Sequence, residues 1–200
     1  MFLREKTIGL NKTIKTLIFS DLLLNSAWGL IGPIFAIFLT QQIKGGSLEM
    51  IGLIAAIFWL TKSLVQPFVG YFLDLKKGEL DDFKVLFFSM FIVNLVPFGY
   101  FFSTQIYQIF ILEFIRGLGM AFVFPSFMAI FTRHIEKGWE ALSWGVNSTL
   151  VGISAGIAGG FGGFLAAIFG FKVVFILVGV FGLISTFSLL AIKSEIFKET

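Results

Sequence analysis

Long apolar runs separated by short polar segments make up most of this chain. Six runs are long enough to cross a hydrocarbon core about 30 Å thick, which takes about 20 residues of α-helix. They lie at residues 16–40, 50–73, 83–102, 106–132, 142–169 and 173–192. Since lipid offers no hydrogen-bond partners to an open backbone, each run is expected to be helical. The pattern predicts an all-α, polytopic membrane protein with six transmembrane helices.

The runs divide the chain into a short N-terminal segment (1–15), a six-helix transmembrane domain (16–192) and a short C-terminal tail (193–200). The first run does not resemble a secretory signal. It is longer than the usual apolar region of about 7–15 residues, is interrupted by polar side chains and has no small-residue cleavage site. We therefore expect it to remain in the protein as the first span.

The basic residues fall mainly on one side of the predicted spans. Eleven of the 15 lysines and arginines lie in the two terminal segments and in the loops that follow the second and fourth spans, whereas the opposite loops carry only Lys44 and Lys172. Positively charged loops stay preferentially in the cytoplasm. Both termini are therefore expected in the cytoplasm, and the protein in the plasma membrane or cytoplasmic membrane.

Composition supports the membrane assignment and excludes several kinds of site. The chain is 57% hydrophobic and 14% charged, against about 25% charged residues in soluble domains. It contains no cysteine, which excludes disulfides and thiolate metal sites. Motifs for nucleotides, metals or other cofactors are lacking, so none is expected. The net charge of +3 comes from loop lysines, and no nucleic-acid partner is expected.

Several polar side chains interrupt the runs near their middle. Charges there cost at least about 2.5–3.5 kcal/mol each and usually face a bundle interior or an aqueous path. The predicted substrate or ion cavity is therefore lined by Asn25, Lys62, Glu113, Arg116 and Asn147. Glu113 and Arg116 share a helix face, so an alternative is an internal pair that only eases insertion. The sequence leaves open whether Asp21 joins this cluster or reaches the membrane interface.

Glycines define one face of the fifth run. Gly152, Gly156 and Gly160 recur every four residues, a spacing that lets helix backbones approach closely, so we expect them to pack against another helix. The segment from Gly152 through Ser154 to Gly156 also matches the G-x-S-x-G pattern of serine hydrolases. However, the single histidine, His134, is predicted at the far end of another span, and such an elbow needs a nearby base. An intramembrane hydrolase is therefore only a minor alternative, and no catalytic residue is expected.

Three short motifs occur in an order that resembles a known transporter family. Gly70 and Asp74 close the second span with the spacing of a glycine, three residues and an aspartate, followed by basic residues. The segment 117–119 has the form Gly-Leu-Gly and precedes Pro125, and segment 170–175 is a short glycine-aromatic-basic link. In this order and spacing, the chain resembles the N-terminal six-helix half of the major facilitator superfamily.

This resemblance implies two inverted three-helix repeats and a secondary active transporter that moves a small solute by alternating access. It implies close helix contact at Gly70 and a conformation-locking role for Asp74. A coupling proton or ion is a further expected partner, and enzyme activity is not expected. A six-helix chain is expected to act as a homodimer or with a second six-helix chain in the lipid bilayer. The alternatives are a non-transporting membrane assembly subunit and a truncated transporter fragment.

Overall fold

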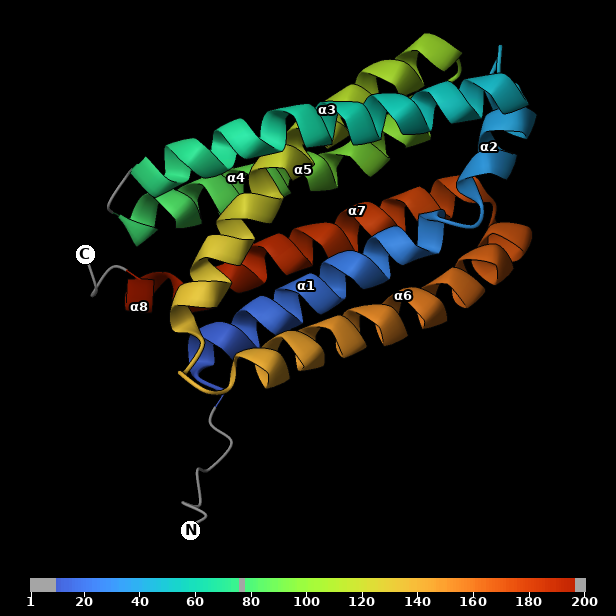
Figure 1. The fold of residues 1–200 in the computed structure, drawn as a ribbon. Helices are drawn as coiled ribbons and strands as arrows, with labels where there is room; N and C mark the ends of the chain where they lie inside the picture. Colours follow the sequence, from blue (N-terminus) through green and yellow to red (C-terminus); the bar gives the residue numbers. More distant parts are fainter. Residues whose placement is uncertain (1–9, 76–77, 197–200) are drawn as a thin grey trace.

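The computed structural model describes residues 10–75 and 78–196 (Figure 1). Their helices are α1 (Lys12–Ile31), α2 (Phe35–Gln42), α3 (Leu48–Leu75), α4 (Glu79–Phe102), α5 (Ile106–His134), α6 (Glu140–Phe169), α7 (Phe171–Ser188), the 3-10 turn η1 (Leu189–Ile192) and α8 (Lys193–Ile196). Six helical segments, α1, α3, α4, α5, α6 and α7 with its extension to Ile196, are long and apolar enough to cross a membrane. The described residues form no strand, only an isolated bridge between Lys44 and Gln105. The all-α prediction is confirmed.

The first predicted span is divided into two helices. The hydropathy pattern predicts one span over residues 16–40, whereas α1 ends at Ile31 and α2 begins at Phe35. Pro33 lies in the intervening turn, where it has no N–H to continue the helical ladder. The other three prolines are accommodated inside helices α3, α4 and α5.

Helix packing follows an inverted repeat. Helix α3 packs on α5 in the same way that α6 packs on α1, and α4 packs on α5 as α7 packs on α1. Exchanging the first three spans (α1, α3, α4) with the last three (α5, α6, α7) therefore preserves these main contacts. Figure 1 shows the result as two layers, with α3 and α4 on one side and α1, α6 and α7 on the other, joined by the oblique α5. This is the half-bundle architecture predicted from the sequence.

Two glycines, one in each of the equivalent interfaces α1–α6 and α3–α5, bring helix backbones close together. A Cβ at Gly162 of α6 would collide with the backbone carbonyl of Leu30 in α1, and a Cβ at Gly117 of α5 would lie 2.7 Å from the carbonyl oxygen of Phe58 in α3. Backbone atoms cannot move away as a flexible side chain can. Glycine is therefore required at both contacts.

The predicted glycine row on α6 faces the other way. Gly152, Gly156 and Gly160 are exposed, and a Cβ at any of them would meet no non-local atom of the described chain within 4 Å. Within the described residues, the contact with α1 is made by Gly162 on a different face, and the expected helix contact of the row stays a prediction. The open row is available to something outside the described chain.

Cysteine labelling tests the orientation of these spans. The chain has no native cysteine, so single cysteines at positions 44, 77, 137 and 172 can be labelled selectively in intact cells. Positions 44 and 172 should react with a membrane-impermeant reagent while 77 and 137 stay protected; Lys77 lies outside the described residues. Because the prediction rests on the distribution of basic loops, the reverse labelling pattern would contradict it.

Candidate functional site

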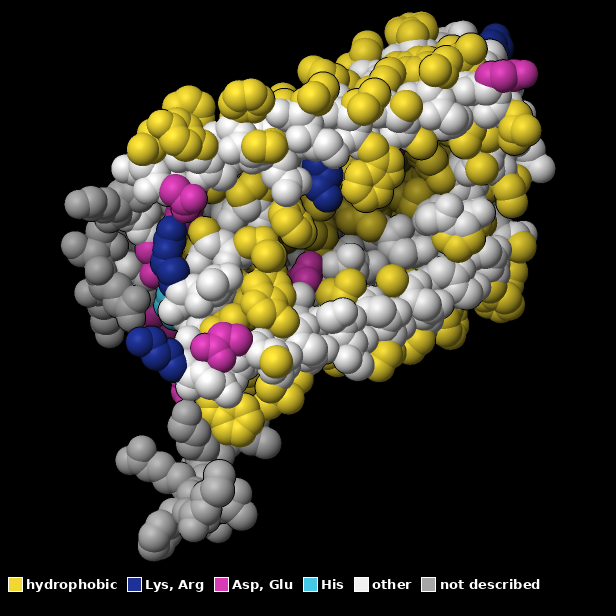
Figure 2. Space-filling view, in the orientation of Figure 1, with side chains coloured by type: hydrophobic (Ala, Val, Ile, Leu, Met, Phe, Trp, Pro, Cys, Tyr) yellow, Lys and Arg dark blue, Asp and Glu magenta, His cyan; other side chains and the backbone are white. Residues whose placement is uncertain are grey.

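A cavity of about 440 Å³ lies between the two layers of the bundle. Its lining combines charged and amide side chains with aromatic residues and methionines. The polar residues among them are Ser20, Asp21, Asn25, Lys62, Arg116, Asn147 and Ser148. Figure 2 shows a hollow between the α3 side and the α6 side of the molecule, with a basic side chain at one edge and an acidic one at the other. Within a bundle of such apolar composition, charged and amide side chains thus gather around this cavity.

Arg116 and Glu113 form the ion pair predicted from their spacing. One guanidinium nitrogen, Nη1, lies 2.8 Å from Glu113 Oε2 and 3.0 Å from Oε1. The carboxylate is 2% exposed, and it also accepts a hydrogen bond from the Tyr100 hydroxyl. Glu113 is thus buried behind the wall as the partner of Arg116, while Arg116 itself lines the cavity.

Two aromatic rings hold the Arg116 guanidinium in place. Its Cζ atom lies 4.2 Å from the centre of the Trp28 ring in α1 and 4.1 Å from that of Phe58 in α3. Arginine over an aromatic face gains about 0.5–2 kcal/mol, with the larger values where water is excluded. The charge is thus fixed between helices that belong to different layers.

Lys62 is the second cation of the cavity. Its ammonium nitrogen lies 5.1 Å from the ring centres of both Trp59 and Phe124. Among the described residues, no carboxylate forms an ion pair with it. Its positive charge therefore faces the cavity without an anionic partner from this part of the chain.

Asp21 forms the acidic part of the opposite wall. Asn25 Nδ2 donates to one carboxylate oxygen at 2.8 Å, and Asn147 Nδ2 donates to the other at 2.9 Å. These amides orient the carboxylate without neutralising its charge. The Asn147 Oδ1 atom is buried and has no hydrogen-bond partner among the described residues.

Four of the five predicted cavity residues line this space, namely Asn25, Lys62, Arg116 and Asn147. Glu113 does not line the cavity, but it pairs with Arg116, which does. Asp21 also lines the cavity, and its position four residues before Asn25 places both on one helix face. The contribution of Tyr100 had no local signal, because it comes from a neighbouring helix.

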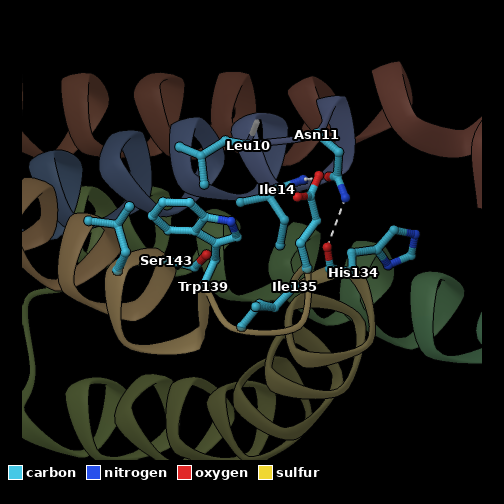
Figure 3. Close-up of a pocket in the computed structure, with 9 residues that line it drawn as sticks. Leu10, Asn11, Ile14, His134, Ile135, Trp139 and Ser143 are labelled. Atoms are coloured by element: carbon cyan, nitrogen blue, oxygen red, sulfur yellow. Dashed lines mark hydrogen bonds between the residues drawn. The ribbon is translucent and has the colours of Figure 1, made fainter. Parts of the chain in front are cut away.

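Polar contacts also join the helices at the end of the bundle where α1 begins. Asn11 Nδ2 donates to the backbone carbonyl of His134 at 2.8 Å (Figure 3), and Lys12 pairs with Glu195 at 2.9 Å. The buried carboxylate of Asp82 pairs with Arg133. The cavity drawn in Figure 3 has a volume of only about 10 Å³, room for about one water molecule. This end is thus a structural junction between α1, α4, α5 and α8.

The two residues of the predicted conformational motif lie at the same end, near the close of α3. A Cβ at Gly70 would meet no non-local atom within 4 Å, and Asp74 is exposed. Inside the described chain, Gly70 makes no close helix contact. The roles suggested by family resemblance stay predictions.

The hydrolase pattern does not form a nucleophile and base. The Ser154 hydroxyl donates to the carbonyl of Val151 in its own helix at 2.9 Å. His134 ends α5, where its Nδ1 lies 3.1 Å from both Glu79 Oε1 and the carbonyl of Ile130. No group of three or more His, Cys, Asp or Glu side chains that could bind a metal occurs in 10–75 and 78–196.

Comparisons with known proteins agree with this architecture. A crystal structure described as that of the POT family transporter PepTSo superposes with a TM-score of 0.73 at 14% sequence identity. The match covers 93% of this chain and 38% of that chain, so the likeness shows the fold, and this chain spans well under half of its neighbour. No match was found among curated proteins. The family model of the Major Facilitator Superfamily matches residues 17–197, and the chain therefore belongs to this family.

Proposed function

We propose that this chain is the six-helix unit of a secondary active transporter that moves a small solute across the membrane by alternating access. The cavity between the layers carries the proposal, because it places two cations, a carboxylate and two amides in an otherwise apolar bundle. Charges within membrane spans are costly and mark transport paths. A proton or ion coupled to the solute would use the same polar walls.

A second six-helix bundle is expected to complete the path. In the most apolar windows of α3 and α6 only 11% and 17% of residues are buried, against 39–44% in the other four spans. These two helices flank the cavity and leave their outer faces uncovered. The exposed glycine row at Gly152, Gly156 and Gly160 offers one such face for close helix contact. The second bundle comes from another copy of the chain, from a different chain or from a further part of a longer protein.

We propose that the protein lies in the plasma membrane or cytoplasmic membrane. In the proposed orientation both termini are in the cytoplasm. The segments 1–15 and 193–200 then flank the transmembrane domain (16–192) on the cytoplasmic side. With this orientation Gly70 and Asp74 lie near the cytoplasmic surface, where a conformation-locking contact with the second bundle is proposed for Asp74.

Accessibility of the cavity to both sides of the membrane distinguishes a transporter from a non-transporting assembly subunit. We expect single cysteines at Ser148 and Val151, which line the cavity, to react with a small impermeant thiol reagent in both right-side-out and inside-out vesicles. In the proposed mechanism the cavity opens alternately to the two sides of the membrane, so both positions should be reachable from each side part of the time. A cysteine at Ile157, on the outer surface of the same helix, is the matched control and should stay unreactive.

Reaction of the cavity positions from one side only would contradict alternating access. Absence of reaction from either side would favour a non-transporting assembly subunit or a truncated transporter fragment that does not form the path.

A further inference from the structure

The two walls of the cavity carry opposite and separated charges. Asp21 and Asn147 belong to α1 and α6, which pack on each other, whereas Lys62 and Arg116 belong to α3 and α5, which pack on each other in the other half of the bundle. No ion pair joins the two walls among the described residues. Each wall therefore presents a charge that the described part of the chain leaves uncompensated.

On the α1 and α6 wall, the missing partner is a cationic hydrogen-bond donor. Among the described residues, only amides bind the Asp21 carboxylate, and an amide carries no positive charge to compensate it. Beside it, the buried Asn147 Oδ1 has no donor, and a buried acceptor without a partner is costly. An ammonium group supplies both needs, since it carries a positive charge and three N–H donors.

On the α3 and α5 wall, the missing partner is an anion. Glu113 already compensates Arg116, so the net charge left on this wall is that of Lys62. Its aromatic neighbours hold the ammonium by their ring faces and supply no negative charge. A carboxylate between Lys62 and the outer edge of Arg116 would bind two cationic groups at once.

We propose that the substrate is a small zwitterion, with an ammonium group bound by Asp21 and Asn147 and a carboxylate bound by Lys62 beside Arg116. This inference rests on the proposed transport function and names its substrate class. The rest of the lining, including Trp28, Phe124, Phe127 and Trp144, suits an apolar body between the two charged ends. A zwitterion compensates both walls and adds no net charge to the membrane interior.

Three probes with the same six-carbon chain test the proposal. They are 6-aminohexanoate, which carries both charges, hexanoate, which lacks the ammonium, and hexylamine, which lacks the carboxylate. Binding to the purified protein in mild detergent is measured by calorimetry and by the shift of the thermal unfolding midpoint. We expect 6-aminohexanoate to bind about tenfold or more tightly than either single-charge probe, because each missing charge leaves one wall unpaired.

Two variants assign the ends of the ligand. In Asp21→Asn the advantage of 6-aminohexanoate over hexanoate should disappear, and in Lys62→Gln its advantage over hexylamine should disappear. Lys172→Gln is the matched control, since this lysine also lies over an aromatic ring, that of Phe101 at 5.2 Å, but does not line the cavity. It should leave all three affinities unchanged.

The ranking of the three probes on the unmodified protein tests the proposal even if a variant fails to fold. Equal affinity for 6-aminohexanoate and either single-charge probe, or binding of none of them, would overturn the zwitterion assignment. The cysteine-accessibility result is independent of these probes. A cavity reachable from both sides with no preference for the zwitterion would retain the transporter and reject its substrate class.

Discussion

Arg116→Gln is expected to deplete the protein from the membrane, and adding Glu113→Gln should restore it. Glutamine keeps a polar side chain but removes the charge that compensates Glu113, whose carboxylate is 2% exposed. Among the described residues, Tyr100 would then be its one remaining hydrogen-bond partner. Breaking a buried ion pair from one side costs about 3–5 kcal/mol, a large share of the about 5–15 kcal/mol that stabilises a typical protein. Membrane abundance and the thermal unfolding midpoint in detergent report the loss.

The double variant separates the structural role of the pair from a role in transport. It removes both charges together, so abundance should return while the cavity wall has lost the Arg116 cation. If abundance is normal in Arg116→Gln alone, the stability of the protein does not depend on the pairing of Glu113 with Arg116. If solute flux in proteoliposomes is intact in the rescued double variant, the pair is structural and Arg116 takes no part in transport.

A single methyl group at Gly162 is expected to be the most damaging alanine substitution on α6. The new Cβ would collide with the backbone carbonyl of Leu30, and only a separation of α1 from α6 would relieve the contact. Overpacking of this kind costs about 1–3 kcal/mol and occasionally more. The unfolding midpoint of Gly162→Ala should therefore fall clearly below that of the unmodified protein.

Gly160→Ala, on the outer face of the same helix, is the matched control. A Cβ there would meet no non-local atom within 4 Å, and alanine favours a helix over glycine by about 0.8–1 kcal/mol. Its unfolding midpoint should stay level or rise. A comparable fall in both variants would contradict the assignment of Gly162 as the inward contact and Gly160 as an open position.

Features that depend on neighbouring positions in the sequence could be predicted. The six spans follow from local hydropathy, and the pairing of Glu113 with Arg116 follows from their separation by three residues. By contrast, the hydrogen bond from Asn147 to Asp21 depends on how α6 approaches α1, which local spacing does not specify. Tyr100 reaches Glu113 from the preceding helix for the same reason.

The sequence also does not show which glycine face of α6 contacts α1. The row containing Gly160 and the face containing Gly162 both consist of small residues, so either would permit a close helix approach. Only the position of α1 decides between them, and it selects Gly162. The regular spacing of Gly152, Gly156 and Gly160 indicates a small-residue face but does not identify its neighbour.

The inverted repeat offers a route to the second conformation that the proposed alternating access requires. The main contacts of the bundle are preserved when the first three spans exchange places with the last three. If each repeat took the backbone conformation now held by the other, the bundle would be turned upside down, with its cavity presented to the other side of the membrane. Under the proposed alternating access, each repeat would supply the template for the opposite state of its counterpart, and the same helix contacts would recur in both states.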